Sequence, residues 1–182
     1  MKGFTLIEML VSVAIFTVVM TMSLSSLLIM TESDRKVQTL KSVVNNLNFA
    51  LESISRTVRT GSVYHCDASV SPISSPRDCA SGATSFSFLN ADNEQVVYCR
   101  GSGGSCSSDG ASILRSVNGG DYAPVISPEV SISVLQFYVT GAESAGIQPK
   151  ATILISGSMQ VDADSSSQFN LETSVTQRLY DQ

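Results

Sequence analysis

Few residues of this 182-residue chain have side chains that could carry chemistry. The chain has one histidine, His65, so His-rich metal sites and His-based catalytic schemes have little material. It has four cysteines, Cys66, Cys79, Cys99 and Cys106, which allow three pairings. Their spacing is too wide and irregular for a zinc ribbon, so we predict no metal site at these residues.

His65 stands beside Cys66, and a Cys/His pair can form a nucleophile and its base. Neighbouring residues of a strand point to opposite faces, however, and a disulfide would remove the Cys66 thiolate. We therefore predict no catalytic residue and no enzyme activity for this chain.

The segment Asp162-Ala-Asp164-Ser-Ser166 resembles the beginning of a calcium loop. It lacks the glycine at the sixth position and the glutamate at the twelfth, where Thr173 stands. A solvated hairpin tip is the simpler interpretation, and calcium is the weaker alternative. The glycine-rich segment 101–104 is predicted to be a flexible loop and not a nucleotide site, so we expect no cofactor.

Glu8 is a carboxylate at the edge of a long apolar segment. Residues 9–31 contain no charged residue, and a helix needs about 20 mainly apolar residues to cross a bilayer. Several residues of this segment can bond their hydroxyls to helix carbonyls, namely Ser12, Thr17, Thr21, Ser23, Ser25 and Ser26. A carboxylate inside a membrane helix costs roughly 2.5–3.5 kcal/mol. Glu8 therefore either lies at the level of the lipid headgroups or has a partner.

The helix is predicted to continue beyond the apolar segment, over residues 4–60, which contain neither proline nor glycine. Gly61 offers a C-terminal cap after Arg56 and Arg59, which suit the helix dipole. Apolar residues recur at steps of three and four, at Val37, Leu40, Val44, Leu47, Leu51, Ile54 and Val58. We expect this stripe to pack on the following domain; a two-stranded coiled coil is the alternative.

Residues 61–182 contain short β-branched and aromatic runs between turn residues, which is typical of antiparallel sheet. The candidate strands are 84–89, 95–99, 112–117, 130–140, 151–156 and 169–178. The apolar alternation changes phase between Val134 and Leu135, which predicts a bulge or bend near Leu135. Turns are expected at 91–94, 118–121 and 163–167. The predicted fold class is α+β, with a long N-terminal helix and an antiparallel head.

Charge is distributed unevenly along the chain. Residues 1–60 have six Lys and Arg against four acidic residues, whereas residues 61–182 have five against twelve. An acidic C-terminal part argues against a general phosphate-binding surface, so we do not expect nucleic acid to be a partner.

Residues Lys2 to Glu8, KGFTLIE, followed by a long apolar helix, resemble the N-terminus of type IV prepilins and pseudopilins. The resemblance implies that a prepilin peptidase cuts after Gly3 and that Phe4 becomes the N-terminus, which is then methylated. It also implies that Glu8 meets the positive N-terminal amine of a neighbouring subunit in a filament. A buried carboxylate paired with an ammonium is far more tolerable than an unpaired one.

The same resemblance implies the organisation of the chain. Its parts would be a leader at 1–3, a transmembrane and filament-core helix at 4–30, an amphipathic continuation at 31–60 and a globular β-rich head packed on that helix at 61–182. Many major pilins carry glycine and proline in the first half of the helix, where Thr17 and Ser25 stand here. This difference favours a minor pilin or pseudopilin.

Export of the head would allow the cysteines to oxidise. Cys66 and Cys79 enclose a Ser/Pro-rich loop, and Cys99 and Cys106 enclose a flexible one. The economical pairing is therefore 66–79 and 99–106, and each disulfide would contribute about 2–3 kcal/mol by loop entropy. Crossed pairing and reduced thiols are the alternatives.

The segments 130–141 and 171–178 resemble those of the J-type minor pseudopilins of type II secretion and the W-type minor pilins. This implies a minor subunit near the tip of a filament for type II-like secretion. A minor pilin for adhesion, motility or DNA uptake is the alternative, and a single-pass anchored binding domain or enzyme is the alternative from another class.

The resemblance also implies partners and a location. The partners would be other pilin or pseudopilin subunits, the prepilin peptidase, an inner-membrane assembly platform and, before assembly, membrane lipid. The protein would cross the cytoplasmic (inner) membrane once with its head outside the cytoplasm, and would then be assembled into a pilus or pseudopilus.

Overall fold

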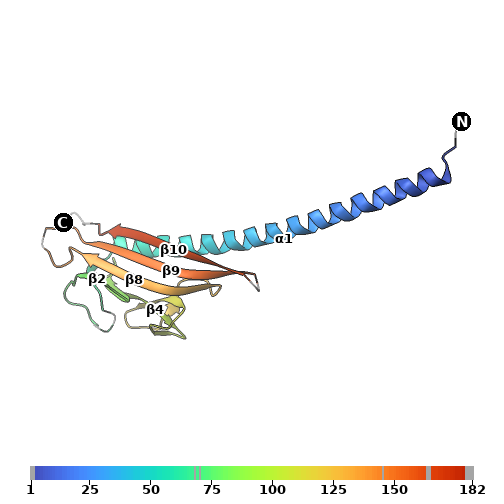
Figure 1. Cartoon of the computed structure of the whole chain (residues 1–182). Helices are drawn as coiled ribbons and strands as arrows, with labels where there is room; N and C mark the ends of the chain where they lie inside the picture. Colours follow the sequence, from blue (N-terminus) through green and yellow to red (C-terminus); the bar gives the residue numbers. More distant parts are fainter. Residues whose placement is uncertain (1–2, 68, 70, 145, 163–164, 179–182) are drawn as a thin grey trace. The chain divides into compact units, whose positions relative to one another are not determined.

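The structure, a computed structural model, describes residues 3–67, 69, 71–144, 146–162 and 165–178 (Figure 1). Within these residues the helix α1, Leu6–Arg59, is followed by strands that pair only antiparallel. The α+β class and the order of helix and sheet are confirmed. The strands are β1 Ser62–His65, β2 Cys79–Ala83, β3 Ser85–Leu89, β4 Gln95–Ser102, β5 Ser105–Cys106, β6 Ser112–Val117, β7 Ala123–Pro124, β8 Val130–Thr140, β9 Lys150–Asp162 and β10 Ser165–Thr176.

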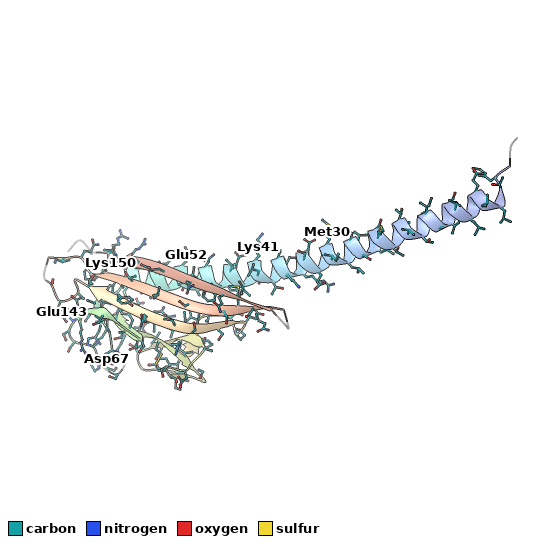
Figure 2. All side chains as sticks on the ribbon, in the orientation of Figure 1. Met30, Lys41, Glu52, Asp67, Glu143 and Lys150 are labelled. Atoms are coloured by element: carbon teal, nitrogen blue, oxygen red, sulfur yellow. A yellow bond between two sulfur atoms is a disulfide. The ribbon has the colours of Figure 1, made fainter. Side chains whose placement is uncertain are left out.

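The chain divides into two compact units, residues 1–41 and residues 42–182. Helix α1 contributes to both, because the boundary falls after Lys41. In the first unit the large apolar side chains from Phe4 to Met30 are all exposed, as at Leu10 (62%) and Ile29 (70%) (Figure 2). The described residues of this unit form no core of their own, so its apolar surface must be covered by lipid or by other chains.

In the second unit α1 buries one stripe against the head. The buried residues are Val43, Leu47, Ala50, Ile54 and Val58. The predicted stripe is confirmed at Leu47, Ile54 and Val58, whereas Leu51 is only half-buried. It is wrong at Val37 and Val44, which are exposed. The prediction used a strict seven-residue repeat, whereas a straight helix drifts by about 20° per heptad. The buried face therefore moves by one residue, to Val43 and Ala50.

The end of α1 is held by the head. The Val58 carbonyl accepts hydrogen bonds from the Tyr64 hydroxyl (2.7 Å) and the Gly61 N–H (2.9 Å), and the Arg59 carbonyl accepts one from the Arg178 N–H (2.8 Å). These bonds satisfy carbonyls that a helix end otherwise leaves without partners. Gly61 thus caps the helix through its N–H, but without the positive φ of the usual capping glycine; a Cβ there would collide with the Phe88 ring.

The strands form two sheets. One has the order β1-β3-β4-β6-β7, with β5 paired to β4, and the other has the order β10-β9-β8-β2. The strands predicted at 112–117 and 130–140 are confirmed to the residue as β6 and β8. Strand β9 continues six residues beyond its predicted end at 156, and β10 begins at Ser165 and ends at Thr176. Strands β1 and β2 were not predicted, because β1 has only four residues and β2, with the sequence CASGA, is rich in small residues.

Two further predictions concern local irregularities. The register of β8 on β9 shifts between Ile132 and Val134, so a bulge exists and lies two residues before the predicted position. Strand β3 is joined to β4 around the predicted turn at 91–94, where Asn90 accepts from the N–H groups of Asp92 and Glu94. The third predicted turn includes residues 163–164, which lie outside the described residues.

Aromatic rings join the two sheets. Phe86 of β3 stacks on Phe137 of β8 with ring centroids 5.5 Å apart, and Phe88 stacks on Tyr98 at 6.1 Å. Tyr64 meets Phe86 edge to face at 5.3 Å. These five side chains are almost fully buried, so they form the centre of the core that α1 covers.

The helix stripe gives a matched test of this packing. We expect Ile54→Ala to lower the free energy of unfolding of the head by about 2–5 kcal/mol, because Ile54 is 2% exposed. Phe49→Ala removes a larger side chain that is 77% exposed, and should change it by less than about 0.5 kcal/mol. Denaturant unfolding of the full-length protein in detergent, followed by tyrosine fluorescence, measures both. Equal losses for the two variants would contradict the packing described.

Candidate functional site

The first turn of α1 contains a reciprocal pair of hydrogen bonds between Thr5 and Glu8. The Glu8 N–H donates to the Thr5 hydroxyl oxygen (3.4 Å), and the Thr5 N–H donates to the Glu8 carboxylate (3.5 Å). Both are long, but together they form a capping box, which satisfies two N–H groups that the helix start leaves free. The carboxylate also lies at the positive end of the helix dipole. Glu8 thus has a partner within its own chain.

The residues of the predicted cleavage site lie just outside this cap. Gly3 and Phe4 precede α1 and belong to no helix or strand. Phe4 is 80% exposed, and a Cβ placed on Gly3 would meet no atom within 4 Å. The Gly3–Phe4 peptide bond is therefore accessible on a non-helical segment, which is the conformation that a protease can bind.

The apolar segment after Glu8 satisfies most of its side-chain hydroxyls within the helix. Hydroxyls of five of the six residues named above donate to carbonyls three or four positions earlier, in the pairs Ser12–Glu8, Thr17–Ala14, Thr21–Val18, Ser23–Val19 and Ser25–Thr21. The prediction for these five hydroxyls is confirmed. Helix α1 is long and apolar enough in this part to cross a membrane. In a membrane, each of these five hydroxyls would therefore keep a hydrogen bond within the helix.

The comparisons with known proteins concern this same segment. Residues 1–24 match the family model described as the prokaryotic N-terminal methylation motif. The match supports a type IV pilin-like subunit. It covers residues 1–3, the capping box and the first part of α1, and leaves residues 25–182 outside. No curated protein and no solved structure matches the chain.

The layout of the chain is pilin-like and agrees with that motif, since a long N-terminal helix precedes antiparallel sheets. The apolar helix and the motif together support membrane anchoring. Members of the pilin-like family are structural subunits and not catalysts.

In the head, the four cysteines lie in two pairs at disulfide distance. The Cα atoms of Cys66 and Cys79 are 6.1 Å apart, and those of Cys99 and Cys106 are 5.8 Å apart. These are the pairs that loop economy favours. The first loop is also held at its end, because the Asp78 carboxylate accepts from the N–H groups of Gly141 (3.1 Å) and Ala142 (2.7 Å).

His65 and Cys66 do not form a nucleophile pair. Cys66 is bonded to Cys79, and the His65 ring accepts through Nδ1 from the Asp67 N–H (3.1 Å). The hydroxyl and the N–H of Ser69 both donate to the Asp67 carboxylate and lower its pKa. His65 and Asp67 thus bind neighbouring main-chain and side-chain groups of their own loop.

Within the described part of the chain, no three His, Cys, Asp or Glu side chains gather in a group that could hold a metal ion. The weaker calcium alternative falls on residues 162–166, and of these 163 and 164 lie outside the described residues.

The capping box of Thr5 and Glu8 was not predicted from the sequence, although Thr-x-x-Glu before an apolar run is its known pattern.

The disulfide pairs can be tested by non-reducing peptide mapping. Trypsin alone leaves Cys79 and Cys99 together on residues 78–100, so it must be combined with a Glu-specific protease that cuts after Glu94. We expect residues 60–77 to be linked to 78–94, and residues 95–100 to be linked to 101–115. A peptide joining residues 60–77 to 95–100 would contradict the pairing.

Proposed function

We propose that the chain is a structural minor subunit of a type IV filament machine, processed by prepilin peptidase after Gly3 and assembled through α1. The observation that carries this proposal is the N-terminal methylation motif over residues 1–24, placed at the start of an exposed apolar helix. The peptidase would remove residues 1–3, and the new N-terminus at Phe4 would be methylated.

Before assembly, the apolar part of α1 resides in the cytoplasmic membrane with the head outside the cytoplasm. The membrane covers the exposed apolar side chains, and the internal hydroxyl bonds remove the cost of the serines and threonines. Glu8 lies only a few residues from the helix start, at the level of the headgroups, where its carboxylate is stabilised by the Thr5 N–H and the helix dipole.

Assembly moves the start of the helix from the level of the headgroups into a filament core. A hydrogen bond from a neutral N–H does not neutralise a carboxylate there, so Glu8 needs a positive partner. Cleavage creates one, because it converts the amide nitrogen of Phe4 into a free amine that is charged at neutral pH. Glu8 pairs with the amine of a neighbouring subunit, and only one axial stagger of two helices satisfies this pair.

The finer assignment is a pseudopilin near the tip of a type II-like secretion filament. Helix α1 is unbroken at Thr17 and Ser25, where many major pilins have helix-breaking residues, which favours a minor subunit. Its partners are then other pilin or pseudopilin subunits, the peptidase and an inner-membrane assembly platform. A minor pilin for adhesion, motility or DNA uptake is the second candidate, because the motif is common to both kinds of filament.

Processing can be tested by intact-mass spectrometry of the protein produced with and without an active prepilin peptidase. With the peptidase, we expect a chain that begins at N-methylated Phe4; without it, the leader remains. Gly3→Leu should keep the leader in both cases, because a branched side chain replaces the residue before the cut. A leader that survives an active peptidase on the natural chain would contradict the proposal.

Three variants separate the two interactions of Glu8. Glu8→Gln keeps a hydrogen-bond acceptor for the capping box and removes the charge, Glu8→Ala removes both, and Thr5→Ala removes only the cap hydroxyl. We expect both Glu8 variants to lower incorporation into filaments at least tenfold, and Thr5→Ala to assemble nearly normally. The readout is the amount of the subunit in purified filaments relative to its amount in membranes.

Normal incorporation of Glu8→Gln would show that the cap alone matters and would contradict the pairing with a neighbouring amine. Normal incorporation of Glu8→Ala as well would favour a permanently anchored binding domain, the candidate from another class.

A further inference from the structure

A cavity of about 390 Å³ opens in the head beside α1, around Arg115. Its walls come from α1, from β4 and β6, and from the segment after β6, at Ser53, Tyr98, Val117, Asp121 and Pro124 among others. Ligand pockets measure about 300–1,000 Å³, so this cavity is large enough for one side chain or a chain end. Strand β4 marks this sheet in Figure 1, and all these residues belong to the second unit.

Arg115 has a buried polar atom without a partner. Its Nε is excluded from solvent and donates to no acceptor in the described residues, and no ion pair of Arg115 is formed within them. A buried donor without an acceptor costs about 1–3 kcal/mol, and more when the group is charged. Such an atom in a natural protein needs an explanation, and a missing ligand is one.

The position of Arg115 is built by the sheet. It pairs with Tyr98 of β4 on one side and with Ala123 of β7 on the other, so these three side chains share the sheet face toward α1. Tyr98 is 2% exposed, and burial raises the pKa of its hydroxyl, so it stays neutral at physiological pH. It therefore does not supply the negative charge that Arg115 lacks.

We propose that this cavity binds the carboxylate of a partner polypeptide, with Arg115 as its receptor. The Nε–H and one terminal N–H of a guanidinium present two parallel donors on one edge, and a carboxylate accepts both. This edge contains the atom that is left without an acceptor, and because that atom is excluded from solvent, the Arg115 side chain has to rotate in the cavity for the edge to meet the carboxylate.

The other walls decide the class of ligand. Val117, Ala123, Pro124 and Val125 give the cavity an apolar side next to the guanidinium. Asp121 lies at the rim as an exposed carboxylate, so the cavity as a whole is not strongly positive and disfavours a doubly charged phosphate. A singly charged carboxylate attached to an apolar chain fits both features, as in a C-terminal residue or in a Glu or Asp beside apolar neighbours. This site is independent of the N-terminal motif and of the filament proposed above.

The test uses the full-length protein in a zwitterionic detergent and in a buffer without carboxylates, with the Arg115 Nε–H signal followed by NMR. The probes are acetyl-Gly-Ser-Val with a free C-terminus, acetyl-Gly-Glu-Val-amide, and acetyl-Gly-Ser-Val-amide as the uncharged control. We expect at least one acid probe to shift the Arg115 Nε–H signal saturably, and the amide control to leave it unchanged. Whichever acid binds more tightly identifies the source of the carboxylate as a chain end or a side chain.

Two variants sharpen the result. Arg115→Lys keeps the charge but loses the two parallel donors, and should weaken binding at least tenfold; because this variant has no Nε–H signal, its binding and that of the natural chain are compared at the main-chain N–H signal of Val117, which lines the cavity. Asp121→Asn removes the rim carboxylate and should strengthen binding severalfold, whereas Arg178→Lys, at an exposed arginine outside the cavity, should change nothing. Dispersed main-chain N–H signals of the head in the same NMR spectra show that each variant is folded.

Several outcomes would overturn the proposal. An Arg115 signal that neither acid probe shifts, equal binding by Arg115→Lys, or loss of binding in Asp121→Asn would each do so. Acetate that binds as tightly as the peptides would also contradict it, because the ligand would then not be a polypeptide.

Discussion

A carboxylate on an apolar helix must have a partner in every environment through which that helix passes. This constraint governs the N-terminal unit. Glu8 is the only charge between Phe4 and Thr31, and in the isolated chain the Thr5 N–H and the helix dipole stabilise it. Those interactions suffice at a wet interface, where the dielectric constant is high, but not in a dry core. The environment of Glu8 therefore decides whether the helix can leave the membrane surface.

The rest of the chain makes such a helix usable. The head donates hydrogen bonds to the last carbonyls of α1 and buries the apolar stripe of the helix from Val43 to Val58. The C-terminal part of the helix therefore belongs to the core of the second unit. None of the large apolar side chains between Phe4 and Met30 is covered. Two kinds of apolar surface thus occur on one helix: one is satisfied within the chain, and the other has to be covered by lipid or by other subunits.

Much of this could be predicted from the sequence, because the strongest patterns are long. The helix ends were placed within two residues, since no glycine or proline interrupts residues 4–60, and β6 and β8 were found where β-branched residues cluster. Short strands such as β2, with the sequence CASGA, have no such pattern and form because Cys79 and Ala83 pair with β8. The buried stripe was predicted correctly at Leu47, Ile54 and Val58, but Val44 and Leu51 were named in place of Val43 and Ala50, because the heptad approximation ignores the drift of a straight helix.

The site was predictable to a different degree. The residues of the motif could be named, since each has a fixed place relative to the apolar run, but the capping bonds of Glu8 depend on side-chain geometry. Arg115 could not be singled out at all. Nothing in the sequence SILRSV distinguishes an arginine that lies on the helix-covered face from one in solvent. The Arg115 Nε lacks an acceptor because β4 and β7 place Tyr98 and Ala123 beside this side chain.

Arg115 also lies in a head with an unfavourable charge for the partner proposed. Residues 61–182 have twelve acidic and five basic residues, so the long-range field repels a carboxylate. That field decays over about 8 Å at physiological ionic strength, whereas a bidentate contact in an apolar cavity is weakened little by salt. Recognition at Arg115 would then depend on contact geometry and not on steering. Variation at this site should therefore change how long a partner stays bound more than how fast it arrives.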